Sequence, residues 1–427
     1  MKPENKASLI KHLNEDYTEP VRDPIWKHIY LSKPLLKITE LPVFQKLNDI
    51  KQLGPTFLIY PGATHTRFNH SLGVFYIAKK IITQFILKSN DINFAIEDIK
   101  AFLCSALLHD IGHYPYAHSL KELNVADHEE LTAEIIINSE ELNRIIEKEL
   151  KISPNYTAAI IDINLEYKNS ENLNLFRRIL SGVLDPDKLD YLNRDAYFCG
   201  VPYGIQDIDF ILNEIYPNKK TGISITNKGL VSVENILFSK YLMYRNVYWH
   251  KKVRIITAMI KKAIFMGLRE NIIIPEDLYD LDDHEFLSKM KSLSYKPFEI
   301  IEKASLKQLF FPACSMPFNE ESPFYKKLCN LDYRYDFESR IACELSNSLK
   351  RPVQPEQVII DIPEKISFEI DLSIIDGDSE VSYPKSASVF TESTVKGFTG
   401  TLRHLSLLVD NDISDEIAKI NMDKFFK

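Results

Sequence analysis

Residues 105–118 read SALLHDIGHYPYAH, and this stretch decides how the rest of the chain is interpreted. An apolar run with the spacing of a helix leads directly into the adjacent pair His109 and Asp110. Gly112 and Pro115 then end that helix. Neutral imidazole and carboxylate are common ligands of divalent metals, and two such side chains at a helix end can reach one ion. The stretch therefore indicates a buried helix that presents a candidate metal site where it ends.

Apolar residues recur at helical spacing on both sides of this stretch. The pattern predicts helices at residues 72–86 and 96–107. It also predicts one extended helix over residues 233–268. We therefore expect a helical bundle over residues 1–275.

β-branched residues become frequent after Pro352. Residues 358–375 and 402–409 alternate in part and predict strands, and a short final helix is expected at about residues 415–426. The expected fold class is thus mainly α, with the helical bundle followed by a smaller C-terminal α+β lobe over residues 276–427.

The whole chain has an acidic and otherwise ordinary globular composition. With 427 residues it is long enough for one large domain and an appended one. Its formal net charge of −8 disfavours general nucleic-acid binding, which needs a basic surface. The N-terminus lacks the apolar core of a signal peptide, and no apolar run is long enough to span a bilayer. Five scattered cysteines form no CxxC pair, so we expect a cytoplasmic protein without a disulfide framework or a membrane partner.

Histidines are concentrated around the central stretch. Of the eleven histidines, six fall within residues 65–128, namely His65, His70, His109, His113, His118 and His128. A lone His-Asp pair is more often a surface feature than a metal site, but this concentration favours the metal interpretation. A metal here can polarise a phosphoryl oxygen or generate hydroxide from water at neutral pH. Two ligands do not fix an ion, so further ligands must come from other helices.

Six motifs in the first two thirds of the chain carry a family resemblance. They are DPIWKHIYL, FQKLNDIKQLG, YPGATHTRFNHSLGV, LLHDIGHYPYAH, DHEEL and DPDKLDYLNRDAYFCGV. In this order they resemble the HD-domain phosphohydrolase family, and within it the branch of the sterile-alpha-motif-and-HD dNTP triphosphohydrolase and its bacterial relatives. The similarity runs through most of residues 20–265 and is weaker in the C-terminal lobe.

The resemblance implies a metal site and a set of catalytic histidines. The implied ligands of one divalent ion (Mn, Mg, Fe, Ni or Zn) are His70, His109, Asp110 and Asp187. The implied catalytic residues are His113, His118 and His128. Of these, His118 would protonate the leaving 5′-oxygen. An additional Mg²⁺ would accompany the substrate triphosphate.

The resemblance assigns three cations to the triphosphate. Arg67 and Lys188 match residues that hold the phosphates, and Lys240 lies where the family often has Arg. These roles suit the side chains, because Arg offers a planar fork of donors and Lys a compact charge.

The resemblance also assigns the residues that contact the nucleoside. Gln52 and Asp195 match the pair that reads the sugar 3′-hydroxyl. Leu53 and Tyr191 match residues packed against the deoxyribose, and Tyr248 lies where an aromatic ring contacts the base.

Helical spacing supports part of this assignment independently. Two sets of residues are spaced at i, i+4 and i+8, namely Asp187, Tyr191 and Asp195, and Lys240, Tyr244 and Tyr248. Residues at this spacing share one side of a helix. Each aromatic alone would more often be a core residue, so the joint pattern carries the interpretation.

One position departs from the family pattern. An acidic residue commonly follows the general-acid histidine three positions later, but Lys121 stands there, with Glu122 beside it. Either Glu122 replaces the acid after a small shift, or His118 lacks an orienting carboxylate.

The leading functional hypothesis is a dNTP triphosphohydrolase that releases deoxynucleoside and intact triphosphate. The alternatives are an HD phosphohydrolase of other nucleotides and a catalytically silent nucleotide-binding regulator. The resemblance implies a homo-oligomer, either dimer or tetramer. The sequence names neither the preferred base nor the metal.

Overall fold

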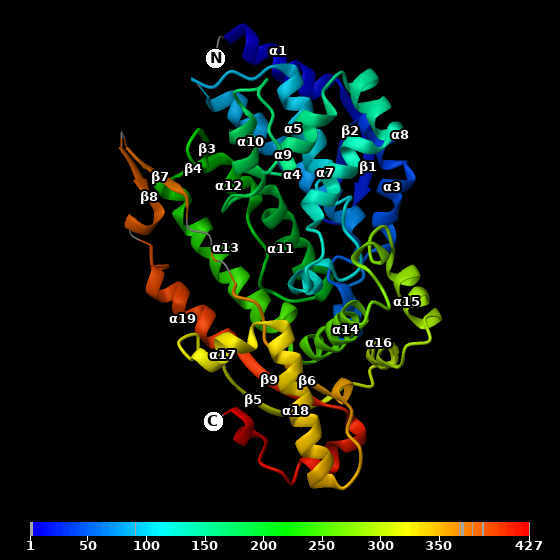
Figure 1. Ribbon diagram of the computed structural model, residues 1–427. Helices are drawn as coiled ribbons and strands as arrows, with labels where there is room; N and C mark the ends of the chain where they lie inside the picture. The colour runs from blue at the N-terminus through cyan, green and yellow to red at the C-terminus, as the bar shows by residue number, and fades with distance from the viewer. Residues whose placement is uncertain are drawn as a thin grey trace.

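The structure is a computed structural model that describes residues 3–89, 91–366, 368, 371–377, 379–386 and 388–426. Helices make up most of it, and the strands of these residues form small sheets of two, four and three strands (Figure 1). The expectation of a mainly α fold with strands in a C-terminal region is confirmed.

The helices and strands have the following bounds. The first helices are α1 (Pro3–Glu15), α2 (Lys33–Thr39), α3 (Pro42–Gln45), α4 (Arg67–Lys88), α5 (Ile96–Leu108), α6 (Ala117–Leu120), α7 (His128–Asn138), α8 (Glu140–Arg144), α9 (Pro154–Ile161) and α10 (Leu173–Leu180). The later helices are α11 (Pro186–Cys199), α12 (Ile208–Glu214), α13 (Leu230–Met243), α14 (Lys251–Arg269), α15 (Asp283–Ser292), α16 (Glu299–Ser305), α17 (Pro323–Leu328), α18 (Leu331–Leu349), α19 (Glu392–Leu402) and α20 (Ser414–Ile417). The strands are β1 (Tyr17–Asp23), β2 (Lys27–Ser32), β3 (Ile215–Asn218), β4 (Gly222–Thr226), β5 (Phe311–Pro317), β6 (Val358–Asp361), β7 (Ser373–Asp376), β8 (Ser379–Ser382) and β9 (His404–Val409).

The four-stranded sheet joins distant parts of the chain. Its order is β3-β4-β7-β8, and β7 pairs in parallel with β4. In Figure 1 the orange strands β7 and β8 accordingly lie beside the green β3 and β4, away from the C-terminal sheet β5-β9-β6. The chain after residue 275 therefore returns to the first part. The domain boundary at residues 275/276 stays a prediction.

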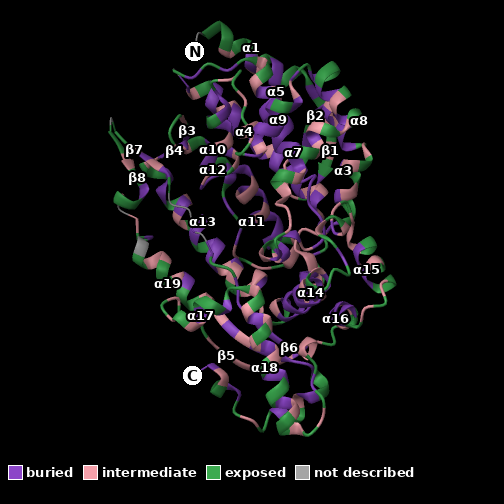
Figure 2. Cartoon of the chain, in the orientation of Figure 1, coloured by how far each residue is buried: buried purple, intermediate pink, exposed green. Residues whose placement is uncertain are grey.

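The apolar core of the first part is built around α4, α5 and α11. The predicted helices 72–86 and 96–107 correspond to α4 and α5, and both bury long apolar stripes (Figure 2). α4 packs against both α5 and α11. Two further apolar cores surround α14 and the sheet β5-β9-β6. Burying a stripe on one face fixes the rotation of each helix, and this determines which residues reach the centre.

The single helix expected over residues 233–268 is wrong. The chain forms α13, then a π-helical turn at Tyr244–Tyr248, and then α14. The break has a local cause, because Trp249 N donates to the Tyr244 carbonyl at 2.8 Å, five residues back, and so widens the turn. His250 then caps α14, with its Nδ1 accepting from Lys252 N at 3.3 Å. Continuous helical periodicity conceals a break of this kind, because the apolar stripe resumes beyond it.

The C-terminal predictions hold in part. Strand β6 lies within the predicted stretch 358–375, and β7 extends one residue beyond it to Asp376, although residues 367, 369 and 370 fall outside the described residues. Strand β9 lies within the predicted stretch 402–409. The single final helix is wrong, because α20 ends at Ile417 and a separate 3-10 turn covers Met422–Phe426. Asn421 separates the two by accepting a hydrogen bond from Asp423 N on its side-chain oxygen at 3.1 Å.

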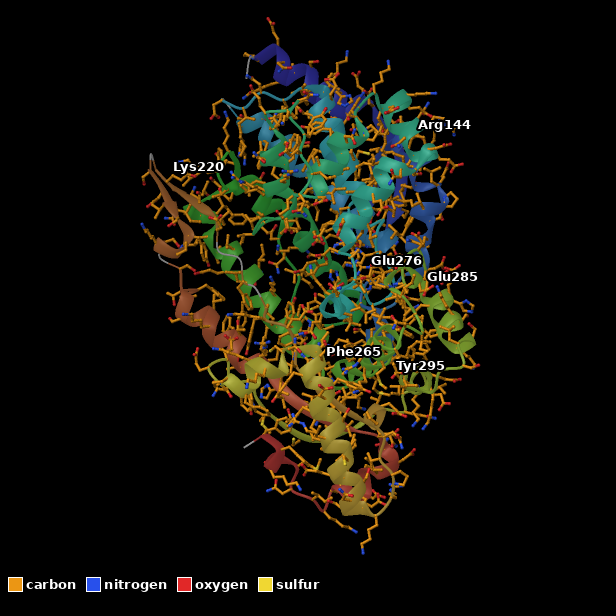
Figure 3. All side chains as sticks on the ribbon, in the orientation of Figure 1. Arg144, Lys220, Phe265, Glu276, Glu285 and Tyr295 are labelled. Carbon is orange, nitrogen blue, oxygen red and sulfur yellow. The ribbon has the colours of Figure 1, made fainter. Side chains whose placement is uncertain are left out.

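Most charged side chains lie on the outside. Arg144, Lys220 and Glu285 are exposed, and Figure 3 shows them at the periphery of the molecule. Charged groups that are buried therefore stand out, and most of them gather around the centre of the bundle. Among the described residues, no helix combines the length and apolar character that crossing a bilayer requires.

Lys79 on α4 is a partly buried cation, and no carboxylate of the described residues lies within ion-pair distance. Its Nζ lies 4.4 Å from the centre of the Tyr17 ring, and burial lowers its pKa to about 8. The folded pKa lies below the unfolded value, so the charge opposes folding at pH 7, and this penalty fades as the pH rises above about 8. We expect Lys79→Met to raise the free energy of unfolding at pH 7 by at most about 1 kcal/mol, given solvent screening.

Urea unfolding of wild type and Lys79→Met at pH 7 and pH 10 measures this effect. The gain should shrink at pH 10, where the wild-type amine is already neutral in the folded protein. A variant less stable than wild type at pH 7 would show that the contact with the Tyr17 ring outweighs the burial of the charge.

Candidate metal centre and nucleotide cavity

Three helix ends bring the predicted metal ligands together. His70 lies in the first turn of α4, whose N-cap is Thr66. His109 is the C-cap of α5, and Asp187 lies in the first turn of α11, whose N-cap is Asp185. Side chains at helix ends can approach one another more closely than those in the middle of packed helices. The site therefore forms where the ends of α4, α5 and α11 meet.

His70, His109 and Asp187 form one group that fits a divalent ion. One ligand atom from each lies within 4.8 Å of the others, and His70 Nε2 is 2.9 Å from Asp187 Oδ1. His109 Nδ1 donates to the Ala106 carbonyl at 3.1 Å, which leaves Nε2 as the acceptor nitrogen. That Nε2 is buried and has no hydrogen-bond partner among the described residues. A buried acceptor of this kind is what a metal ligand offers.

The carboxylates around His70 also favour its protonated form. Burial opposes the charged form, but hydrogen bonds to Asp187 and Asp190 raise the pKa of His70 to about 10. Metal ligation needs a neutral imidazole, so an ion that binds at Nε2 displaces the proton there.

Asp110, the fourth predicted ligand, lies beside this group. Its Oδ1 is 3.5 Å from His109 Nε2, while its Oδ2 accepts from Arg67 Nη1 at 2.7 Å. Burial alone would raise the pKa of Asp110, but His113, His109 and Arg67 hold it well below its usual range. The carboxylate of Asp110 is therefore ionised and able to bind a metal cation.

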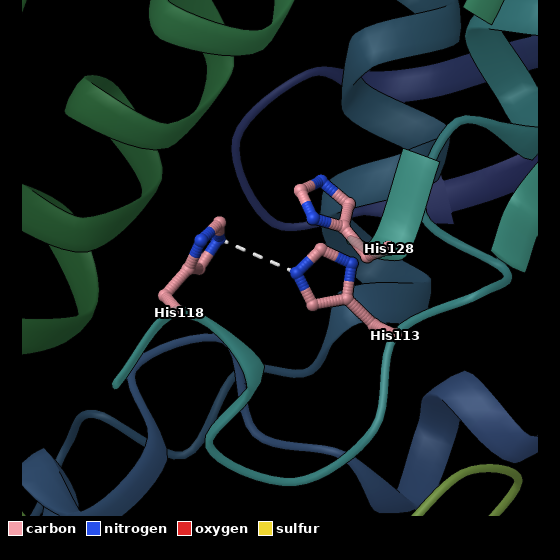
Figure 4. A group of neighbouring side chains, drawn as sticks. All are labelled: His113, His118 and His128. Atoms are coloured by element: carbon pink, nitrogen blue, oxygen red, sulfur yellow. Dashed lines mark hydrogen bonds between the residues drawn. The ribbon is translucent and has the colours of Figure 1, made fainter. Parts of the chain in front are cut away.

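The three predicted catalytic histidines form a second group (Figure 4). His113 Nε2 and His118 Nε2 are 3.3 Å apart, and the rings of His113 and His128 are centred 3.9 Å apart. Burial and the charge of Arg67 lower the pKa of His118 to about 4, and burial holds those of His113 and His128 well below their usual range. All three are therefore neutral near pH 7 in the free protein, beside the cationic Arg67.

Two backbone features bring these histidines together. Gly112 lies where a Cβ atom would be 2.5 Å from the His128 carbonyl oxygen, so glycine lets α7 approach the turn after α5. Tyr116 adopts a left-handed conformation with φ 62° as N-cap of α6, which carries His118. Such a conformation is uncommon for an aromatic residue and must be held by its surroundings, here the Phe286 ring at 5.3 Å.

Glu122 does not replace the missing acid beside His118. Its Oε2 accepts from Lys261 Nζ at 3.0 Å and lies 3.4 Å from Arg334 Nη1. Both partners compensate its charge, and they draw the carboxylate toward α14 and α18. Of the two alternatives left by the sequence, the structure favours a His118 without this orienting carboxylate.

A cavity of about 680 Å³ opens onto the metal group. Most of the predicted residues line it, namely Gln52, Leu53, Arg67, His70, His109, Asp110, His118, His128, Asp187, Tyr191, Asp195, Lys240 and Tyr248. Lys188 and His113 are not part of its wall. The fully buried His113 lies behind His118, and Lys188 Nζ pairs with Asp185 Oδ2 at 2.6 Å. A second hollow, of about 720 Å³ near residues 93–98 and 147–156, contains none of the predicted residues.

The predicted sugar contact Asp195 is held from two sides. Tyr248 donates its hydroxyl to Asp195 Oδ2 at 2.7 Å, and His65 Nε2 lies 2.8 Å from Oδ1. The ring of Tyr191 meets that of Tyr248 edge-on at 6.4 Å. The sequence interpretation gave His65 no role, although it belongs to the cluster of six histidines and to the motif YPGATHTRFNHSLGV.

Comparison with known proteins places these features in a family. The family described as HD domain matches residues 67–181, and that described as HD associated region matches residues 207–419. An uncharacterized protein from Methanocaldococcus jannaschii is 36% identical over 289 residues, covering 67% of this chain and 58% of that protein. The deoxynucleoside triphosphate triphosphohydrolase SAMHD1 from Danio rerio is 28% identical over 289 residues, covering 60% of this chain and 46% of its own length.

A solved structure extends the comparison to nearly the whole chain. A phosphohydrolase from Bacteroides thetaiotaomicron superposes with a TM-score of 0.67 at 25% identity, over 91% of this chain and 99% of its own. The chain spans only about half of the length of the curated relatives that it matches. His70, His109 and Asp110 all fall within the matched HD domain. This chain belongs to the HD-domain family.

Proposed function

We propose that the chain is a metal-dependent phosphohydrolase of nucleotides and, more specifically, a dNTP triphosphohydrolase. The observation that carries this proposal is that one cavity joins two different sites. The candidate metal group of His70, His109 and Asp187 opens onto the same 680 Å³ space as the Asp195–Tyr248 pair. The volume lies in the range of small-molecule sites. The named SAMHD1 relatives support the nucleotide substrate.

A divalent ion at this site would act as a Lewis acid toward a phosphoryl oxygen. The residues around it supply the other requirements of phosphoryl transfer. Arg67 is buried, and its Nε has no hydrogen-bond partner among the described residues, so this donor is available to a phosphate oxygen. Lys240 lines the same cavity and adds positive charge.

His118 would deliver the proton that the leaving 5′-oxygen needs. In the free protein this imidazole is neutral near pH 7, because burial and Arg67 lower its pKa. A bound triphosphate brings several negative charges next to it, which favour the protonated form. The substrate itself would thus raise the pKa of His118 toward the range in which a general acid works.

The cavity should select deoxyribose over ribose. Leu53 and Tyr191 would crowd the 2′ side of the sugar, while Gln52 and Asp195 bind its 3′-hydroxyl. An added 2′-hydroxyl would clash or remain unpaired, and an unpaired buried polar group costs roughly 1–3 kcal/mol, or about 5- to 150-fold. We expect kcat/KM for dGTP to exceed that for GTP by this factor, measured by release of the phosphate product. Equal values for the two nucleotides would contradict the assigned sugar contacts.

The decisive experiment is incubation with each dNTP and Mn²⁺ or Mg²⁺, followed by identification of the phosphate product. Intact triphosphate and deoxynucleoside support the proposal. Pyrophosphate or orthophosphate would instead identify a phosphohydrolase that cleaves elsewhere or acts on other nucleotides. Binding without turnover would identify a silent nucleotide-binding regulator.

A further inference from the structure

The second ring nitrogen of His70 is bound by a carboxylate that the sequence interpretation gave no role. His70 Nδ1 lies 2.8 Å from Asp190 Oδ2, on the side of the ring opposite Asp187. Asp190 lies on α11, one helical turn after Asp187, and its side chain is completely buried. A fully buried carboxylate needs several hydrogen bonds to remain ionised.

Asp190 receives those bonds from two other side chains. Arg194 donates twice, from Nε to Oδ2 at 2.8 Å and from Nη2 to Oδ1 at 2.9 Å. Trp26 Nε1 also donates to Oδ1, at 2.5 Å. The third arm of Arg194, Nη1, donates to Asp23 Oδ2 at 2.8 Å. Because the bidentate bond and the indole fix both oxygens, the carboxylate cannot rotate away from His70.

Gly73 of α4 makes room for this network between α4 and α11. A Cβ atom at Gly73 would lie 1.8 Å from Asp190 Oδ1 and 2.5 Å from Arg194 Nη2. No side chain fits at these distances. The packing of the two helices is therefore built around the carboxylate, one turn along α4 from His70.

We infer that Asp190 is a positioning residue that fixes His70 as the Nδ1–H tautomer and so presents Nε2 to the metal. This inference rests on the proposed metal site. An ionised carboxylate only accepts hydrogen bonds, so His70 must donate from Nδ1. The lone pair of Nε2 then faces Asp187 and His109. When a carboxylate that binds a ligating imidazole in this way is mutated, the metal affinity typically falls by about 10- to 100-fold.

Asp190→Asn tests the inference, with Asp23→Asn as the matched control. Both substitutions remove one carboxylate charge from the buried Arg194, so both should lower stability. Only Asp190→Asn also changes the partner of His70, because an amide can donate to Nδ1 and so favour the wrong tautomer. We expect the Kd for Mn²⁺, measured by electron paramagnetic resonance, to rise about 10- to 100-fold in Asp190→Asn. Asp23→Asn should bind Mn²⁺ nearly as tightly as wild type.

Equal Mn²⁺ affinities of the two variants would overturn the positioning role and leave the metal site intact. A wild-type protein that binds no Mn²⁺ would overturn the metal site and this inference together. Nitrogen-15 NMR of the Zn²⁺-loaded wild type gives a second measurement, which remains decisive if Asp190→Asn does not fold. It should show a slowly exchanging proton on Nδ1 of His70, and a ring without that proton would overturn the inference.

Discussion

Replacing Asp110 by alanine is expected to remove bound divalent metal and to lower kcat/KM by about 10³-fold or more, beyond the 10- to 100-fold typical of residues that only orient a ligand. The carboxylate lies 3.5 Å from His109 Nε2 and is held ionised in a buried position. Without it, His70, His109 and Asp187 carry a single formal negative charge, which weakens the attraction for a divalent ion. The measurement is metal content by mass spectrometry together with steady-state rates.

Asp110→Asn is the control for packing in this experiment. It keeps the size of the side chain and an oxygen that can accept from Arg67, whereas alanine leaves the buried guanidinium of Arg67 without its partner. Both variants should lose metal, and Asp110→Ala should also lose stability. A folded Asp110→Ala protein with full metal occupancy would show that Asp110 is not a ligand.

Replacing His118 by alanine is expected to lower kcat by about 10²- to 10⁴-fold, the usual contribution of a general acid, with metal content unchanged. His118 lines the cavity and lies outside the metal group of His70, His109 and Asp187. Glu122→Gln is the informative control. Glu122 bonds to Lys261 and not to His118, so its loss should reduce stability and leave kcat within a few-fold of wild type.

Proton uptake gives a second measurement of the same role. The pKa of His118 is about 4 in the free protein, and the triphosphate should raise it. Binding of a non-hydrolysable dNTP analogue near pH 6 should therefore take up protons, as calorimetry in two buffers of different ionisation enthalpy can measure. The uptake should be smaller in His118→Ala. Wild-type kcat in His118→Ala would assign the proton transfer to another group.

Local sequence patterns predicted two of the three helices whose ends carry the candidate metal ligands, α4 and α5, because each has a clear apolar stripe. The stripes of α4 and α5 and the break after Leu108 follow directly from residue spacing. The interruption between α13 and α14 could not be predicted from residue spacing, because no glycine or proline marks it. At this interruption Trp249 N donates to the Tyr244 carbonyl, five residues back. Whether the chain forms this bond or the usual bond to the residue four back depends on tertiary packing.

The sequence predicted site residues that stand together in a motif. It did not predict the contacts that hold these residues in place, because the contacting side chains lie far away along the chain. His109 and Asp110 are adjacent, and helical spacing put Asp187, Tyr191 and Asp195 on one side of a helix, where the structure shows all three lining the cavity. The partners that hold these residues lie far along the chain, as His65 does from Asp195. Lys188, which the sequence assigned to the phosphates, instead pairs with Asp185, the N-cap of α11, and does not line the cavity.

The parallel pairing of β7 with β4 has a consequence for how the protein is made. Residues 224–226 of β4 pair with residues 373–375 of β7. The edge of β4 that faces β7 therefore stays unpaired until nearly 150 further residues have been synthesised. An uncovered strand edge is a template for pairing with other chains. At the usual synthesis rate of about 5–20 residues per second, this exposure lasts on the order of ten seconds. The first part of the chain therefore completes its sheet only after residues 373–375 have been made, and fragments that end before residue 373 keep an open edge.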